Sequence, residues 1–318
     1  MAPSWQRWVA DNLLRGVDGP DLVDGLVGGG VPPGLARRTV AEIAASPGLA
    51  AARESQRRAN RTAQVVRLDT ELRGGAVLRR EAPGADEFFA NDWALGRPAI
   101  FTDVIPRWHR RWTPEYLRER YGDVEVQACL GRDRDPRPDA NWQRHAITLT
   151  FGEYITRVLE TESGNDLYLI ANNHNTARPE LQSLWEDLVL PEGWFNEPKL
   201  ANGSALWVGP AGTHTPLHHD TSNILFCQVY GRKRIVLAPP GAPALLDAAD
   251  GVYSGMTAEQ ALAADLGAVE VVVEPGEALF IPVGWWHDVL ALDVSVSLAI
   301  NAFARPNVFS WYTPGALR

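Results

Sequence analysis

Short apolar or alternating runs, separated by Gly, Pro, Asp and Asn, fill residues 205–303 and constrain the fold more than any other feature. Alternation at every second position is typical of strands with one buried face. Similar runs begin near residue 76, with helices predicted from Thr113, over 151–159, over 177–188 and from near Thr257. Residues 73–318 are therefore predicted to form one mainly β domain with flanking helices.

Residues 1–72 have a different pattern. Trp5, Val9 and Leu13 recur at helical spacing, and Ser46-Pro47 suits the start of a longer helix rich in Arg and Ala. We expect a separate N-terminal helical region, which either packs on the main domain or recruits a substrate or partner.

Three side chains in the β region have the character of metal ligands. His218 and Asp220 lie two positions apart next to a predicted strand, so both can face one metal while His219 points away. His287 is a third candidate ligand. Two histidines and a carboxylate hold non-haem Fe(II) on one face and leave other positions open. This pattern alone leaves several metals and reactions possible.

Lysine is rare in this chain, which has only Lys199 and Lys233. Residues 224–237 are predicted to form a hairpin that turns at Gly231-Arg232, so that Tyr230 faces Lys233. Alternation then puts Lys233, Ile235 and Leu237 on the buried face, with Arg232 and Arg234 outward. A buried ammonium group needs an anion nearby, and the carboxylate of a cofactor would serve.

Three sequence blocks in this order resemble the JmjC-type, cupin-like Fe(II)/2-oxoglutarate-dependent oxygenases, particularly small hydroxylases of the factor-inhibiting-HIF type. The blocks are Thr215-Pro216-Leu217-His218-His219-Asp220, then Gln228-Val229-Tyr230-Gly231-Arg232-Lys233-Arg234, then Pro275-Gly276-Glu277-Ala278-Leu279-Phe280-Ile281-Pro282 with Trp285-Trp286-His287. The resemblance covers roughly residues 76–305. It implies a double-stranded β-helix, a jelly roll whose two sheets enclose the metal.

The resemblance also assigns roles to individual residues. The catalytic iron ligands would be His218, Asp220 and His287. The distal carboxylate of 2-oxoglutarate would be bound by Lys233, Tyr168 and Thr215, with Asn301 near this cofactor. Trp207 would line the pocket, and His214 is a further candidate for its lining. Fe(II), 2-oxoglutarate and O2 would together oxidise a substrate C–H bond, with release of succinate and CO2.

The substrate remains open at this stage. The leading hypothesis is hydroxylation of an amino-acid side chain in a peptide or protein, by analogy with the family. Hydroxylation of a small natural product is the second hypothesis. A non-enzymatic, cupin-like metal-binding or interaction protein is the third. The presence of Lys233 disfavours a metal cupin that works without 2-oxoglutarate.

Composition restricts the partners and the compartment. A formal charge of −9 argues against nucleic-acid binding, which needs a basic surface. The cluster Arg107, His109, Arg110 and Arg111 with Trp108 and Trp112 is therefore interpreted as a solvated edge beside packing tryptophans. Two cysteines and no apolar segment of membrane-spanning or signal-peptide type indicate a cytoplasmic protein without membrane association. The oligomeric state stays open.

Overall fold

The structure is a computed structural model that describes residues 1–318 apart from 74–75, 106–107, 109–110, 265 and 315–318. Contacts divide the chain into two compact units, Met1–Leu68 and Asp69–Arg318. Among the described residues, no helix is both long and apolar enough to cross a lipid bilayer.

The first unit consists of helices around a small apolar core. The helices are α1 (Pro3–Leu14), α2 (Gly19–Gly28), α3 (Pro33–Ala44) and α4 (Pro47–Arg73), the last of which continues past the unit. Val9, Leu22 and Leu26 are buried together in this core. The hydroxyl of Ser46 accepts a hydrogen bond from the Leu49 amide at 3.2 Å, which confirms the predicted start of α4.

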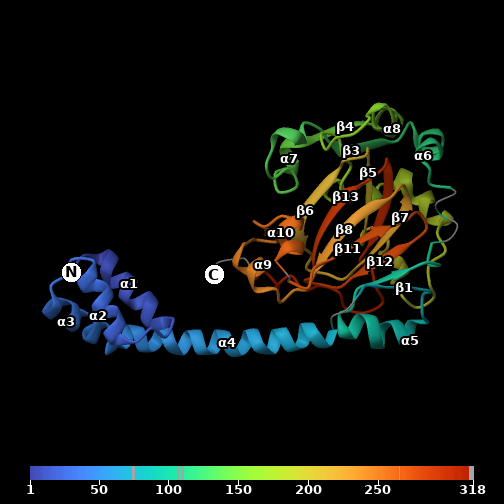
Figure 1. Ribbon diagram of the computed structural model, residues 1–318. Coiled ribbons are helices and arrows are strands. Elements are labelled where there is room, and N and C mark those ends of the chain that lie inside the picture. The colour runs from blue at the N-terminus through green and yellow to red at the C-terminus, as the bar shows by residue number, and fades with distance from the viewer. Residues whose placement is uncertain (74–75, 106–107, 109–110, 265, 315–318) are drawn as a thin grey trace. The chain divides into compact units, whose positions relative to one another are not determined.

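The second unit is built on two six-stranded sheets (Figure 1). In spatial order, the first sheet contains β1 (Leu78–Arg80), β2 (Ala99–Phe101), β12 (Ala278–Ile281), β7 (Ile224–Tyr230), β14 (Ser295–Ile300) and β5 (Ser204–Gly209). The second contains β11 (Val269–Val273), β8 (Lys233–Ala238), β13 (Trp286–Ala291), β6 (His214–His219), β10 (Tyr253–Ser254) and β9 (Ala249–Asp250). All their strand pairings are antiparallel except that of β1 with β2. The predicted jelly-roll core is confirmed.

Nearly all residues of strand β7 are apolar, and the surroundings of the strand explain why. Leu225 and Val229 point to the helical side and join a core that includes Trp194. Phe226 points between the sheets, where it packs in one cluster with Ile235 of β8. Because the first sheet is covered on both faces, its central strands need apolar residues at consecutive positions.

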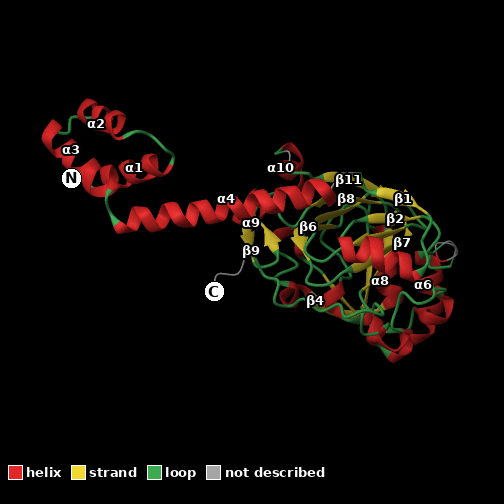
Figure 2. Cartoon of the chain, turned by 90° about the horizontal axis from the view of Figure 1, so that it is seen from below, coloured by secondary structure: helices red, strands yellow, loops and turns green. Residues whose placement is uncertain are grey.

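Shorter elements flank the sheets. A third sheet pairs β3 (Glu125–Cys129) with β4 (Ala146–Thr150). The α- and π-helices are α5 (Ala85–Glu87), η1 (Phe88–Trp93), α6 (Pro114–Tyr121), α7 (Trp142–His145), α8 (Phe151–Glu160), α9 (Pro243–Asp247) and α10 (Ala258–Ala263). The 3₁₀ helices are η3 (Arg132–Arg134), η4 (Ala171–Asn173), η5 (Asn175–Ala177), η6 (Pro179–Asp187) and η7 (Glu197–Lys199). Helices α6 and α8 pack against each other beside the first sheet (Figure 2).

The predicted helices near Thr113, over 151–159 and near Thr257 are confirmed as α6, α8 and α10. Thr113 and Thr257 each cap their helix, because each hydroxyl accepts a backbone N–H of the first turn. The segment predicted as a helix over 177–188 is instead the 3₁₀ helix η6.

The predicted hairpin at Gly231-Arg232 is wrong. β7 pairs with β12 and β14 in the first sheet, whereas β8 pairs with β11 and β13 in the second. The turn therefore crosses between sheets, and Tyr230 does not pair with Lys233. Gly231 has a φ of +68°, and a Cβ there would clash with the Val294 carbonyl oxygen.

The predicted alternation in β8 is confirmed. Lys233, Ile235 and Leu237 are buried. Arg232 and Arg234 point outward, where they pair with Asp293 and Glu270. The prediction of which side of β8 is buried was thus correct, although the predicted pairing partner of the strand was wrong.

The aromatic part of the 107–112 cluster is also as predicted, because Trp108 and Trp112 are both buried. Arg111 forms an ion pair with Asp187 at 2.7 Å. Arg107, His109 and Arg110 lie outside the described residues.

Candidate active site

Adjacent strands of the second sheet bring the three predicted metal ligands together. His218 of β6 is paired in register with His287 of β13, and Asp220 follows directly after β6. The two imidazole rings are 4.1 Å apart between centroids, and His287 Nε2 lies 3.3 Å from Asp220 Oδ2. One ligand atom from each of the three residues lies within 4.8 Å of the others. Two nitrogens and one carboxylate oxygen match the donor set of a facial Fe(II) site.

Backbone carbonyls orient both imidazoles. His218 Nδ1 is 2.8 Å from the Pro216 carbonyl oxygen, and His287 Nδ1 is 3.0 Å from that of Trp285. A proton on each Nδ1 leaves each Nε2 with a lone pair directed at the shared site. Burial, and then the nearby His287, lower the pKa of His218 to about 4. His218 is therefore neutral near pH 7, as a metal ligand must be.

His219 faces away from this site, as strand alternation predicts. Its ring packs against Trp286 and Tyr312, with centroids 4.8 and 5.2 Å away. The residue is fully buried, so the outer face of β6 is covered rather than solvated.

A β-bulge in β6 determines which neighbours share the face of His218. His287 pairs with His218 and Val289 pairs with Thr215, so Pro216 and Leu217 together lie opposite Asp288. The extra residue reverses the alternation upstream of His218. Thr215 consequently points into the site although it is three positions from His218.

The same bulge turns His214 outward. Its Nε2 is 2.8 Å from Asp288 Oδ2, on the side of the sheet opposite Thr215 and Val289. His214 does not line the cavity beside the triad, contrary to expectation, because simple alternation from His218 ignores the extra residue.

A cavity of about 450 Å³ adjoins the triad between the two sheets. Apolar side chains of both sheets form part of its wall, among them Phe226, Ile281 and Val289. Lys233, Tyr168 and Thr215 also line it. The cavity is large enough for a small dicarboxylate together with part of a substrate.

Lys233 is 1% exposed and provides a cationic end to this cavity. Its Nζ donates a hydrogen bond of 3.0 Å to the Tyr168 hydroxyl and lies over the rings of Tyr168 and Phe226. No carboxylate of the described residues forms an ion pair with it. Burial accordingly lowers the pKa of Lys233 to about 7. An anion bound here would compensate the desolvated charge.

Tyr168 is held as a neutral hydroxyl beside Lys233. Burial raises the pKa of Tyr168 well above its usual value, opposed by Arg132 and by hydrogen bonds with the Thr213 and Thr215 hydroxyls. Of the two predicted hydroxyl residues, Tyr168 contacts Lys233 directly, and Thr215 lines the same cavity. Hydroxyls and an ammonium group suit a carboxylate.

Trp207 and Asn301 lie further out in the same cavity. Trp207 of β5 is half-buried, and its ring centroid is 5.4 Å from that of Tyr168. Asn301 directly follows β14, is exposed, and lines the cavity wall. Both lie where the sequence interpretation placed them, along the cavity rather than among the metal ligands.

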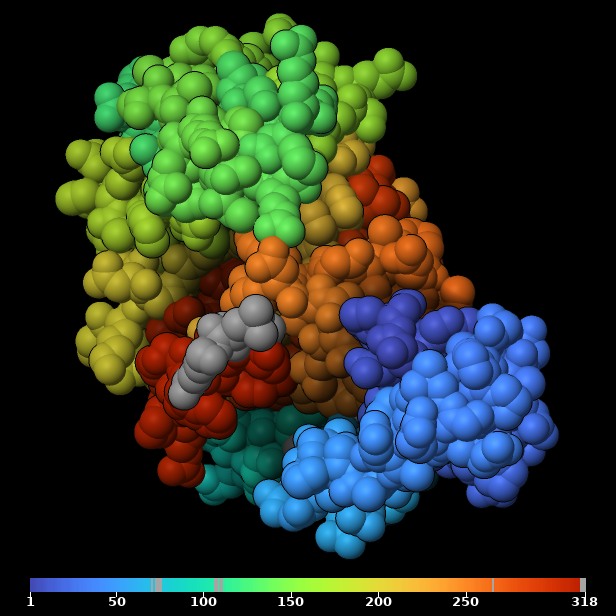
Figure 3. Space-filling view, turned by 90° about the vertical axis from the view of Figure 1, so that its left-hand side faces the viewer, coloured from blue at the N-terminus to red at the C-terminus, as the bar shows by residue number. Residues whose placement is uncertain are grey.

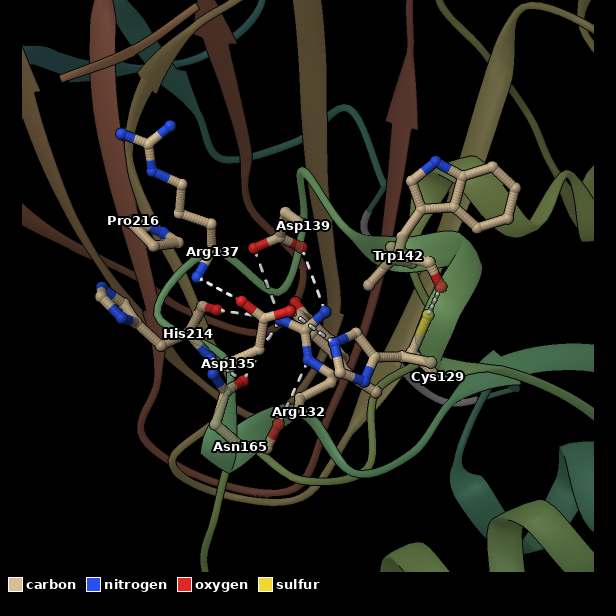
Figure 4. A network of polar contacts seen from close by, with 12 residues as sticks. Cys129, Arg132, Asp135, Arg137, Asp139, Trp142, Asn165, His214 and Pro216 are labelled. Atoms are coloured by element: carbon tan, nitrogen blue, oxygen red, sulfur yellow. Dashed lines mark hydrogen bonds and ion pairs between the residues drawn. The ribbon is translucent and has the colours of Figure 1, made fainter. Parts of the chain in front are cut away.

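The loop 131–141 supplies a cavity residue that the sequence interpretation missed. Asp139 lines the cavity and is held by the fully buried Arg132, whose Nη1 lies 3.2 Å from Asp139 Oδ1 (Figure 4). The Arg132 guanidinium also donates to the backbone oxygens of Asn165 and His214. An acid held in this way is preorganised to accept a hydrogen bond from a bound molecule.

Further contacts fix the same loop. Asp135 accepts hydrogen bonds from Arg137 N and Asn141 Nδ2, and its carboxylate is 3.0 Å from His145 Nε2. Arg137 pairs with Asp250 of β9 at 2.6 Å, so the loop contacts the second sheet. Figure 3 shows this contact on the surface, where green residues of the loop meet orange residues near 250.

Two other cavity residues have no signal in the sequence motifs. Tyr253 of β10 lies beside the His218 ring, with centroids 6.0 Å apart. His174 has a φ of +51°, a conformation uncommon for a residue with a side chain, and it is exposed at the cavity wall. Its neighbours Asn173 and Asn175 are buried and hydrogen-bonded to Gln127, which holds this segment in place.

Comparison with known proteins agrees with this geometry. The sequence profile of the cupin-like domain family matches residues 85–308. Lysine-specific demethylase 8 of Xenopus tropicalis is 27% identical over 248 residues, which cover 73% of this chain and 53% of that protein. The 2-oxoglutarate and iron-dependent oxygenase JMJD4 of Mus musculus is 28% identical over 247 residues, covering 67% and 57%.

A third relative, tRNA wybutosine-synthesizing protein 5 of Danio rerio, is 28% identical over 249 residues, covering 69% of this chain and 72% of that protein. The chain spans only a little more than half the length of the first two relatives. The family uses Fe(II), 2-oxoglutarate and O2, and the donor set and the buried lysine fit these groups. The chain belongs to the cupin-like domain family, within the JmjC-type Fe(II)/2-oxoglutarate oxygenases.

Proposed function

We propose that this protein is an Fe(II)- and 2-oxoglutarate-dependent dioxygenase that hydroxylates a C–H bond on an amino-acid side chain of a peptide or protein. The observation that carries the proposal is a buried lysine without an anionic partner among the described residues, in the same cavity as a facial triad. A metal cupin without a dicarboxylate cofactor would have no use for that charge.

The proposed roles follow from the positions of the side chains. His218, Asp220 and His287 would hold the iron, with Nε2 of each imidazole as ligand. Lys233, Tyr168 and Thr215 would bind the distal carboxylate of 2-oxoglutarate. When bound, iron and 2-oxoglutarate supply the oxidation, which consumes O2, releases succinate and CO2, and inserts oxygen into a C–H bond.

The remaining cavity wall would position the substrate. Phe226, Ile281 and Val289 exclude water from the reacting region. Asp139 would accept a hydrogen bond from a polar substrate group, and Trp207 would pack against its apolar part. The peptide assignment rests on analogy within the family.

A panel of short peptides and small metabolites tests the proposal. The protein is incubated with Fe(II), 2-oxoglutarate and ¹⁸O2, and both succinate and substrate mass are measured. We expect at least one peptide to stimulate succinate release and to gain a single ¹⁸O atom. Stimulation by metabolites alone would support the natural-product hypothesis instead.

The non-enzymatic hypothesis gives a different result. Neither succinate release nor oxygen incorporation would exceed that of His287→Ala under any condition.

The proposed cytoplasmic location is supported by Cys129 and Cys227, which are both free and buried.

A further inference from the structure

The middle of helix α4 lacks the buried face that most protein helices have. Residues 53–65 are exposed at every position. A helix that is exposed all round gains nothing from packing and depends on its own side-chain pairs. If the only role of this stretch is structural, side chains three or four positions apart should therefore attract one another and stabilise the helix.

The arginines of this stretch repel one another and so destabilise the helix. Arg53, Arg57 and Arg61 recur every four residues on one face, a spacing at which like charges destabilise a helix. Glu54 offsets only Arg58, at 2.6 Å. Arg57 and Arg61 form no hydrogen bond or ion pair with any described residue, so their guanidinium groups are available to an outside anion.

Exposed apolar residues continue the same face. Val65 and Leu68 follow Arg57 by eight and eleven positions, and they are 67% and 57% exposed. The opposite face carries small uncharged residues such as Ser55 and Ala59. The combination of cations and exposed aliphatic side chains on one face is typical of a binding surface for an amphipathic partner.

We propose that this arginine face, made of Arg57, Arg61, Val65 and Leu68, binds an acidic amphipathic segment of a partner protein. Carboxylates spaced by one helical turn would match the arginines, and apolar residues beside them would cover Val65 and Leu68. Nucleic acid would use the arginines but leave the aliphatic pair exposed, and the chain's charge of −9 opposes it. The proposal is independent of the catalytic function, because the face lies outside the family match at residues 85–308.

Fluorescence anisotropy with the full chain tests this binding. The probe is a labelled helical peptide of about 20 residues, long enough to be partly helical in water, with Glu and Leu on one face. Comparison probes are the same peptide with Gln for Glu, a scrambled version, and a single-stranded RNA of similar length. Sedimentation velocity at low salt reports self-association.

Two variants remove the proposed contacts. We expect Arg57→Gln/Arg61→Gln to weaken binding of the Glu peptide by about 5- to 30-fold, and to reduce its salt dependence. Val65→Ser/Leu68→Ser should weaken it by about tenfold. The control Ser55→Glu/Ala59→Glu changes the net charge by the same amount as the arginine variant and should alter affinity by no more than about twofold. Circular dichroism checks that each variant keeps its helix.

Four results would overturn the proposal. They are no binding of the Glu peptide, equal binding of its scrambled version, equal weakening by the Ser55/Ala59 control, and tighter binding of the RNA through the same arginines. Dissociation of a dimer by Arg57→Gln/Arg61→Gln would show instead that a second copy of the chain occupies this face.

Discussion

At the scale of single residues, the proposed reaction class depends most on Lys233. The triad alone fits several metals and chemistries, since His218, Asp220 and His287 specify a donor set only. An ammonium group buried without an anionic partner among the described residues costs free energy in the unliganded protein. A bound dicarboxylate would offset this cost, which is the reason for proposing that Lys233 binds 2-oxoglutarate.

Replacement of Lys233 by Ala should weaken 2-oxoglutarate binding by about 30-fold or more, because it removes the charge that pairs with the distal carboxylate. Binding of Mn(II), used as a redox-stable substitute for Fe(II), should change little. Calorimetry measures both affinities. Lys199→Ala is the matched control, since the only other lysine is exposed. Equal loss of metal and 2-oxoglutarate binding would contradict the assigned role.

The affinity for 2-oxoglutarate should fall as the pH rises above 7. Burial lowers the pKa of Lys233 to about 7 in the free protein, whereas the bound dicarboxylate needs the protonated ammonium. Above pH 7 a proton must be taken up on binding, so Kd should rise by up to about tenfold per pH unit. Titrations of Mn(II)-loaded protein between pH 7 and 9 measure this slope. A slope unchanged in Lys233→Met would assign the pH dependence to another group.

At the scale of elements, the parts of the site differ in how far the sequence predicts them. His218, Asp220 and the buried side of β8 follow from local spacing, and they are found as expected. The inward position of Thr215 depends on a bulge opposite Asp288, which local alternation cannot reveal. The kind of turn at Gly231 depends on which sheet β7 and β8 each join. That is determined by pairing with strands distant in sequence, which local patterns do not reveal.

The loop 131–141 is a further element that local pattern does not reveal. Its role comes from Arg132, which contacts residues 33 and 82 positions away. Sequence spacing carries no signal for contacts of that kind. Charged residues in a loop are usually solvated, and the sequence gives no sign that Arg132 is fully buried.

Arg132→Met should lower the free energy of unfolding by about 3–5 kcal/mol, because it leaves the Asp139 carboxylate buried and unpaired. The double variant Arg132→Met/Asp139→Leu should recover part of this loss. Urea unfolding measures both. Arg137→Met breaks the exposed pair with Asp250 and serves as the control, with an expected change below about 1 kcal/mol. If the double variant is less stable than Arg132→Met, the ion pair is not the source of the effect.

At the scale of the whole molecule, the proposed catalytic cavity and the proposed arginine face lie in different units of the chain. All residues that line the active-site cavity lie between Asp139 and Asn301, in the second unit. The first unit has its own core and carries the exposed arginine face. The sequence predicted a helical N-terminal region and a β domain, but it did not predict that residues 53–65 of α4 would be exposed throughout, as they are in the described part of the chain.

Removal of residues 1–68 should leave cofactor binding intact. We expect a chain that begins at Asp69 to bind Mn(II) and 2-oxoglutarate within about twofold of the full chain, since no cavity residue is removed. The same truncation should abolish binding of the acidic helical peptide. Calorimetry and anisotropy measure the two properties separately. Loss of cofactor binding in a folded truncated chain would show that the units are not functionally separate.

The most direct test of the central claim is the absorption spectrum of the protein with Fe(II) and 2-oxoglutarate in the absence of O2. A visible metal-to-ligand charge-transfer band should appear, saturate with one equivalent of Fe(II), be absent in His218→Ala, and need far more 2-oxoglutarate in Lys233→Ala. Absence of the band in the folded full chain would contradict the assignment of iron and 2-oxoglutarate to this cavity.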